Sequence, residues 1–325
     1  MRIAIDALGG DNGSKVVIVA IKDFKKEYPN DEIIVFGKKE ELEELSSICR
    51  IEDAPEVVPM EAGALEVIRM KNSSMCKAIN TMKEEGFDAI VSAGSTGGFL
   101  SAATLILKVI PGVKRAALVT AFPTKIKGKK VVVLDVGANN ENSPEELVQF
   151  AYMGKAYNQA LFSNKEPKTY LLSNGAEAHK GSPLVKEAHK LLKEKEFEGF
   201  MGNMEARDVL SGDADIIVAD GFSGNVLLKG MEGIAKMMSS MIKANFKKNL
   251  WTKLGYLHVR KGFKDMSETM DYKSVGGAML LGINGVVVKA HGNSDAYSFK
   301  NAIRVARQMA EFDVVNKIKE SLGNE

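Results

Sequence analysis

The feature that most constrains the fold is an alternation between short runs of apolar, β-branched residues and longer stretches with helical periodicity, such as 14–28. Near-continuous apolar strands that alternate with helices predict a mostly parallel sheet, covered by helices on both faces. The predicted strands span 2–6, 32–37, 89–92, 131–136, 169–172, 215–219 and 286–289.

Four of the predicted strands are followed by turns rich in glycine and small polar residues, at 8–11, 94–98, 135–139 and 220–225. In open α/β sheets, such turns line the crevice beyond the carboxyl ends of the strands. Their backbone amides, and the helix N-termini that follow, bind anions. Taken together the turns predict one shared anion site, although glycine at any single turn can serve only to make the turn tight.

Two predicted helices begin with clear signals. Ser143 precedes Pro144 and has a glutamate three residues later, which is the pattern of a capping box, and Ser182 precedes Pro183. The uncharged stretch 89–107 is long enough to raise the question of a membrane span. Glycine, serine and threonine interrupt it, so it is interpreted as strand, turn and helix.

The composition is that of a globular protein with a large core, with 325 residues of which 45% are hydrophobic and 26% charged. A net charge of +2 does not suggest a nucleic-acid-binding surface. Cys49 and Cys76 have no metal-type spacing, which favours a reducing compartment over a disulfide scaffold. The histidines lack zinc spacing, and no dinucleotide, Walker A or nucleophile-elbow motif occurs in the sequence. No metal, nucleotide cofactor or serine acyl-enzyme is therefore predicted.

Six segments, in order along the chain, resemble the PlsX family of phosphate acyltransferases. They are 5–11 (IDALGGD), 91–97 (VSAGSTG), 134–139 (LDVGAN), 177–181 (EAHKG), 220–226 (DGFSGNV) and 289–295 (KAHGNSD). They cover nearly the whole chain, and together they are specific where each alone would be weak. The chain departs from the family's pattern at 12–14, at 173–176 and at Ser95.

The resemblance implies a three-layer α/β/α sandwich similar to isopropylmalate dehydrogenases and phosphotransacetylases, usually a homodimer. It implies transfer of a fatty acyl group from acyl-acyl carrier protein to inorganic phosphate, without a cofactor, giving acyl-phosphate for phospholipid synthesis. A membrane-bound glycerol-3-phosphate acyltransferase is then a candidate partner. The expected location is the cytoplasm, peripherally at the inner face of the membrane, with no nucleic-acid partner.

The resemblance assigns catalysis to Lys180 and Asn225, and substrate binding to the glycine-rich turns and two further segments. The expected substrate-binding residues are Asp6, Gly9, Gly10, Asp11, Gly94, Ser95, Thr96, Gly97, Asp135, Gly137, Asn139, Glu177, Asp220, Ser223, Gly224 and His291. Without the resemblance, Lys180 is one surface lysine among many and Asn225 is a helix N-cap. The strand-end aspartates then only brace loops, and His291 is a hydrogen-bonded loop residue.

The expected chemistry suits these residue types. Phosphate is largely dianionic at neutral pH, so its attack on a thioester needs positioning and a stabilised oxyanion more than a strong base. A lysine can bind phosphate or polarise the carbonyl, and an asparagine amide can donate to either oxygen. Short-chain phosphotransacetylase chemistry, nicotinamide-dependent oxidation on a related fold, and a non-catalytic membrane scaffold remain the alternatives.

One stretch, 233–264, carries eight cations and no acidic residue, so the rest of the chain has a net charge of 2 − 8 = −6. We expect a single domain over 1–325 with a basic amphipathic helical projection near 233–270. Basic segments that contain Trp and Leu can lie on an anionic bilayer. The resemblance implies peripheral membrane association through a helical projection, so membrane contact is expected at Trp251, Leu254 and Leu257. The alternatives are a solvated helix with a core or dimer face, or a docking surface for the acidic carrier protein.

Overall fold

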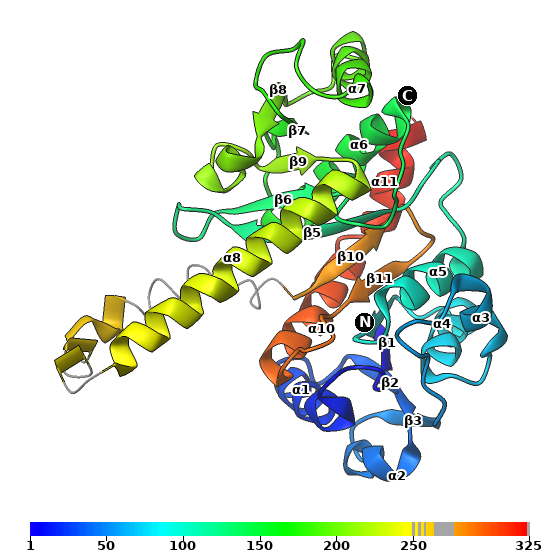
Figure 1. The fold of residues 1–325 in the computed structure, drawn as a ribbon. Helices are drawn as coiled ribbons and strands as arrows, with labels where there is room; N and C mark the ends of the chain where they lie inside the picture. The colour runs from blue at the N-terminus through cyan, green and yellow to red at the C-terminus, as the bar shows by residue number, and fades with distance from the viewer. Residues whose placement is uncertain (249–250, 253–254, 257, 263–275, 324–325) are drawn as a thin grey trace.

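The computed structural model describes residues 1–248, 251–252, 255–256, 258–262 and 276–323. A single sheet of eleven strands runs through the described chain (Figure 1). In sheet order the strands are β3 (Arg50–Asp53), β2 (Glu32–Gly37), β1 (Arg2–Asp6), β4 (Ala89–Ser92), β11 (Val286–Lys289), β10 (Ala278–Leu281), β5 (Ala117–Pro123), β6 (Lys130–Leu134), β9 (Ile216–Val218), β7 (Thr169–Ser173) and β8 (Phe200–Glu205).

The two central strands set the directions of the others. β5 and β10 each run antiparallel to both of their neighbours. The strands from β3 to β11 are therefore parallel to one another, as are those from β6 to β8, but the two groups point in opposite directions. The prediction of a mostly parallel sheet is confirmed, since seven of the ten strand pairings are parallel and the three antiparallel ones, around β5 and β10, lie at the centre.

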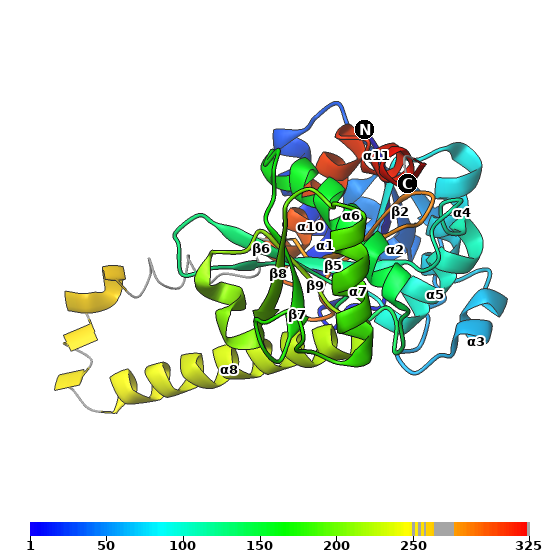
Figure 2. The same ribbon diagram turned by 90° about the horizontal axis from the view of Figure 1, so that it is seen from above.

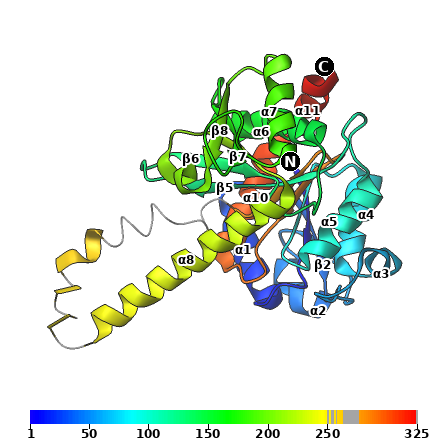
Figure 3. The same cartoon turned by 45° about the horizontal axis from the view of Figure 1, so that its top comes forward.

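Helices cover both faces of the sheet, as Figures 2 and 3 show from two further directions. One face carries a continuous apolar core against α1, α6, α7, α10 and α11. The other face has two separate cores, one beneath α3, α4 and α5 and one beneath α8. The helices are α1 (Gly13–Glu27), α2 (Lys39–Leu42), α3 (Ala64–Arg69), α4 (Ser74–Glu85), α5 (Thr96–Leu107), α6 (Pro144–Phe162), α7 (Pro183–Glu194), α8 (Gly221–Lys247), α10 (Ala296–Glu311) and α11 (Val314–Gly323), with 3-10 turns η1 (Glu43–Leu45) and η2 (Ala206–Ser211).

Local signals in the sequence agree well with the structure. Ser143 forms the predicted capping box at the start of α6, and Ser182 caps α7. The uncharged stretch 89–107 forms β4, a turn and α5. Among the described residues, no helix is both long enough and apolar enough to cross a bilayer. The sandwich of sheet and helices predicted from the resemblance is confirmed.

α8 continues well beyond the sheet that it covers. Its first turns pack on β6, whereas its last part extends away from the body of the molecule (Figure 1). Trp251 follows it and is 82% exposed. Leu254 and Leu257, the other two expected membrane contacts, lie outside the described residues. The expectation of one domain over 1–325 stays a prediction.

Candidate active site

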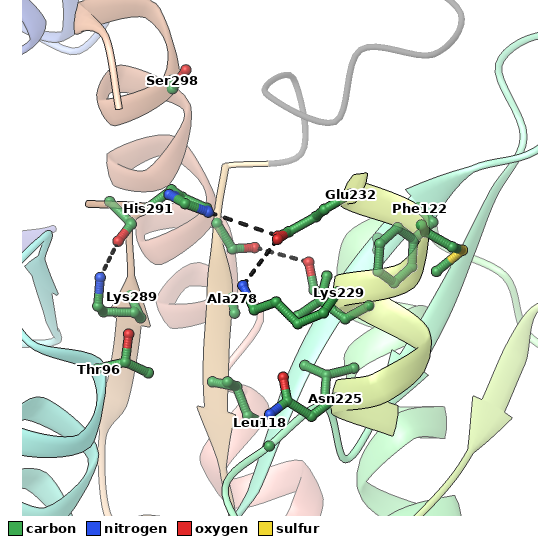
Figure 4. A pocket seen from close by; sticks show the side chains of 18 of the residues that line it. Thr96, Leu118, Phe122, Asn225, Lys229, Glu232, Ala278, Lys289, His291 and Ser298 are labelled. Atoms are coloured by element: carbon green, nitrogen blue, oxygen red, sulfur yellow. Dashed lines mark hydrogen bonds and ion pairs between the residues drawn. The ribbon is translucent and has the colours of Figure 1, made fainter. Parts of the chain in front are cut away.

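A cavity of about 920 Å³ lies on the face of the sheet that carries two cores, over β5 and β10. Figure 4 shows α8 on one side of it, bearing Asn225 and Glu232, with Thr96, Lys289 and His291 on the other. The lining is largely apolar, which suits a ligand with a hydrocarbon part. Its apolar side chains include Met60, Leu118, Phe122, Leu210, Leu228 and Met231.

The turns after β1 and β4 lie in direct contact. A Cβ atom on Gly9 would stand 2.8 Å from the Cα of Gly94, and Gly9 has a φ of +84°, so only glycine allows this approach. Asp11 and Thr96, one from each turn, line the cavity. Ser95 caps α5 by accepting a hydrogen bond from Gly98 N at 3.3 Å.

The turns after β6 and β9 also meet, and Asp135 holds them in shape. Its Oδ1 accepts hydrogen bonds from the backbone amides of Leu118, Gly137 and Ala138, and its Oδ2 accepts two from Asn139. Burial raises the pKa of Asp135, and these bonds oppose the rise. Asp135 and Asn139 therefore brace the turn, as the alternative interpretation of the strand-end aspartates predicted, and do not line the cavity.

The carboxyl ends of the two strand groups face opposite directions, so the four turns are not at equivalent ends of one parallel sheet. The cavity nevertheless takes one residue from each, namely Asp11, Thr96, Gly137 and Asn225. β6 ends at Leu134, opposite Val119, and the next residue, Asp135, accepts a hydrogen bond from the Leu118 amide, so the turn after β6 lies near the start of β5. The two pairs of turns consequently approach each other across β5 and β10.

Asn225 is free to act on a ligand because another residue caps its helix. The N-cap of α8 is Asp220, whose Oδ1 accepts from Ser223 N at 2.9 Å. Asn225 lies one turn further on, is exposed, and lines the cavity. The alternative that Asn225 itself caps the helix is wrong.

Lys180 does not line the cavity, and its side chain is exposed. Its turn follows β7, where Gly181 N donates to Asn174 Oδ1 and Asn203 Nδ2 donates to Glu177 O. β7 pairs in parallel with β9, so this turn lies at the same edge of the sheet as the start of α8. Glu177, Gly97, Ser223 and Gly224 likewise lie outside the cavity lining.

Lys289, a buried cation of the cavity, is not among the site residues predicted from the sequence. Strand register places Asp6 beside Ser92 and Ser92 beside Lys289, so the three side chains share one face of the sheet. Ser92 Oγ donates to Asp6 Oδ2 at 2.6 Å, and Lys289 donates to the carbonyl of Ala290. Burial lowers the pKa of Lys289 to about 8, against the opposing attraction of Asp6 and Asp11. A lysine that ends an otherwise apolar strand was the signal available.

Charged side chains from two elements meet at the cavity. Lys229 Nζ lies 2.9 Å from Glu232 Oε2, and His291 Nε2 lies 3.7 Å from Glu232 Oε1. His291 thus links the loop after β11 to α8. Among the described residues, no group of three or more histidine, cysteine or acidic side chains is placed to hold a metal ion.

Comparison with known proteins identifies the family. A family model described as "Fatty acid synthesis protein" matches residues 1–317. A phosphate acyltransferase of Exiguobacterium is 42% identical over 98% of both chains, and one of Thermodesulfovibrio yellowstonii is 40% identical over 99% of this chain and 94% of its own. The chain belongs to the PlsX family of phosphate acyltransferases. It is an acyltransferase whose acceptor is phosphate.

Solved structures agree on the fold of this phosphate acyltransferase. A phosphotransacetylase from Streptococcus pyogenes superposes with a TM-score of 0.61 at 19% identity, covering 96% of this chain and 94% of its own. A branched-chain phosphotransacylase from Enterococcus faecalis gives 0.60 at 16% identity, covering 95% and 99%. The likeness confirms the α/β/α sandwich with a mixed central sheet.

Proposed function

We propose that the acyl donor is acyl-acyl carrier protein, that the nucleophile is inorganic phosphate, and that the two meet in the cavity between α8 and the turn after β4. The observation that carries this proposal is the cavity's lining, which combines apolar side chains such as Phe122 and Met231 with the polar groups of Thr96, Asn225 and Lys289. The apolar part suits a fatty acyl chain, and the polar part suits phosphate and a thioester carbonyl.

In this reaction an oxygen of hydrogenphosphate forms a bond to the thioester carbon, and the C–S bond breaks. The proton of hydrogenphosphate passes to the leaving thiolate, so acyl-phosphate and a free thiol are the products. The carbonyl oxygen gains negative charge in the transition state. The Asn225 amide, which can donate two hydrogen bonds, is proposed to stabilise that charge.

Lys180 is proposed as the second catalytic residue because the family resemblance assigns it that function. Its support in the structure is indirect, since its turn and the start of α8 lie at the same edge of the neighbouring strands β7 and β9. Bringing its ammonium to the cavity requires movement of the exposed side chain or of its turn. The direct comparison of Lys180 with Asn225 is therefore a central test.

The decisive assay supplies purified enzyme with long-chain acyl-acyl carrier protein and phosphate, without added metal or nucleotide. Acyl-phosphate and free carrier-protein thiol are expected in equal amounts. Equal turnover of acetyl-CoA would instead favour short-chain phosphotransacetylase chemistry. Loss of turnover on chelation would overturn a metal-free mechanism, and absence of turnover with either thioester would show that the acyl donor is of another class.

We propose further that the protein is a homodimer in which α8 provides an apolar contact surface. The exposed apolar side chains of α8 recur at helical spacing, and a surface of this kind is expected to be covered by a partner. They are Phe222, Val226, Ile234, Met237, Met238 and Met241. A second copy is the natural occupant because it presents the same stripe, as a two-fold interface requires.

We also propose peripheral membrane association, on the cytoplasmic side, through the basic segment after α8. Its support is the eight cations over 233–264, five of which follow α8, and the exposure of Trp251. Acyl-phosphate is amphiphilic, so release beside a bilayer would favour its transfer to a membrane-bound glycerol-3-phosphate acyltransferase. An acidic carrier protein is the competing ligand for the same cations.

A further inference from the structure

The row formed by Asp6, Ser92 and Lys289 is an unusual polar feature beside the cavity, which Lys289 lines and the other two residues do not. Each is under 8% exposed, and each ends one of three adjacent parallel strands. A lysine is rarely buried unless a partner compensates its charge. The ion pairs formed among the described residues do not include Lys289, whose ammonium donates only to the carbonyl of Ala290.

The other cations of the cavity are differently placed. Lys229 is neutralised by Glu232 at 2.9 Å, and Lys125 is exposed. The His291 side chain is 50% exposed and lies near the same Glu232. Of the basic groups that line the cavity in the described chain, Lys289 is the buried one, facing away from bulk solvent and toward the space where the reactants would meet.

The groups next to Lys289 in the row are themselves held in position. Asp6 is held in turn by Ser92 Oγ at 2.6 Å and by Leu8 N at 3.1 Å, so its carboxyl is anchored to two backbone segments. Thr96 lies beside Lys289 in Figure 4 and offers a hydroxyl at the N-terminus of α5. A small, highly charged anion would find a cation and a hydroxyl donor there together.

We infer that Lys289 is the residue that binds the attacking inorganic phosphate, and that Asp6 and Ser92 are positioning residues that hold its ammonium in the cavity. This inference rests on the proposed function, in which phosphate attacks the thioester in the same cavity. A phosphate dianion supplies a direct ion-pair partner for the buried ammonium, which Asp6 and Asp11 attract without forming an ion pair. The phosphodiester of the carrier protein's pantetheine arm has the same oxyanion chemistry, so the test must separate the two sources.

The test compares Lys289→Met, which keeps an unbranched side chain as far as the ε position and removes the ammonium, with the same change at Lys186, an exposed lysine on α7. Lys289→Met is expected to raise the KM for phosphate at least about tenfold, the usual effect of losing a hydrogen bond to a charged group. The KM for acyl-acyl carrier protein should change less than about twofold. Lys289→Arg should restore part of the phosphate affinity, and Lys186→Met should behave as wild type.

Isothermal titration calorimetry of each protein with inorganic phosphate measures the phosphate affinity independently of turnover. Phosphate binding that is weakened in Lys289→Met but intact in Lys186→Met supports the inference. This holds even if wild type fails to use acyl-acyl carrier protein, because that failure would contradict only the proposed acyl donor. An unchanged phosphate affinity in folded Lys289→Met overturns the inference that Lys289 binds phosphate. A raised KM for the carrier protein with unchanged phosphate KM assigns Lys289 to the pantetheine phosphodiester and overturns it as well.

Discussion

Asn225 lies directly against the backbone of Gly137, so the glycine-rich turn after β6 sets the position of the proposed catalytic amide. A Cβ atom added to Gly137 would stand 3.2 Å from Asn225 Cγ and 3.4 Å from its Nδ2. Gly137 also has a φ of +126°, a conformation that side chains disfavour. The glycine therefore has two separate functions, in the turn itself and in the room that it leaves for Asn225.

Gly137→Ala is expected to lower kcat by at least about tenfold, because small displacements of a catalytic group are costly. The strained backbone should also reduce the free energy of unfolding by about 1–2 kcal/mol. Gly128→Ala is the matched control, since Gly128 has a φ of +81° but open space around it. Comparable loss of kcat in both variants would show that strain, and not displacement of Asn225, is responsible.

Asn225→Ala and Lys180→Ala should each reduce kcat by roughly 100-fold, the effect of removing one oxyanion donor. Both folds should survive, because both side chains are exposed. Steady-state kinetics with varied phosphate would check this, with circular dichroism as the control for folding. Near-wild-type turnover in either variant removes that residue from catalysis, and a rise confined to the KM for phosphate makes Lys180 a binding residue.

The sequence predicted local structure better than it predicted which residues meet. Strand β11 has the predicted bounds, and the alternation of predicted strands with predicted helices indicated the fold class. β5 and β10 escaped notice, and they are the strands that run antiparallel to their neighbours. Without them, the four turns could not be assigned to opposite ends of the sheet, nor could the cavity be placed between them.

Which residues meet in the site could likewise not be predicted from local sequence patterns. Asp6 and Lys289 are 283 positions apart, and only the strand order β1, β4, β11 brings them into one row. A family motif can name Lys180 and Asn225, but it cannot say that Lys180 is exposed while Lys289 is buried. Burial depends on packing between distant segments, which local pattern does not encode.

Phosphate use should depend on pH through Lys289. Since the pKa of Lys289 is lowered to about 8, its ammonium is protonated below that pH and neutral above it. We expect kcat/KM for phosphate to fall as pH rises through about 8, and this fall to disappear in Lys289→Arg. The charged and titratable groups around Lys289 are Asp6 on β1, Asp11 on the following turn, His291 on its own loop, and Lys229 and Glu232 on α8.

Thermodynamic linkage offers a second check on the same group. A lysine with a lowered pKa binds fewer protons in the folded than in the unfolded protein between about pH 8 and 10.5, its ordinary pKa. The contribution of Lys289 to the free energy of unfolding should therefore rise with pH over that range. Urea titrations of wild type and Lys289→Met should diverge accordingly, and parallel pH profiles would contradict a perturbed Lys289.

The proposed homodimer predicts that charges on the apolar stripe of α8 will separate the subunits. Met237→Glu combined with Met241→Glu places two carboxylates on side chains that are 55% and 57% exposed. Analytical ultracentrifugation should then show monomers where wild type sediments as a dimer. Ser239→Glu combined with Lys243→Glu, on another face of the helix, is the control. A monomeric wild type would refute the dimer.

The basic segment after α8 can bind a bilayer by two additive effects. Each cation near an anionic surface contributes about 1 kcal/mol, and salt weakens this attraction. Insertion of apolar side chains adds free energy in proportion to the area that they bury. Trp251, 82% exposed, shows that apolar surface is available at this segment. Electrostatic attraction without insertion would be lost at high salt, so the two effects can be separated.

Replacing Trp251, Leu254 and Leu257 together with serine should release the protein from anionic liposomes in a flotation assay, while turnover of soluble acyl-acyl carrier protein persists. Leu65→Ser is the control, because Leu65 is an apolar side chain 73% exposed on the body of the molecule. A wild type that fails to float even at low salt would contradict membrane binding. The cations would then be better explained as a docking surface for the acidic carrier protein, and Lys253→Glu or Arg260→Glu should raise its KM in a salt-dependent manner.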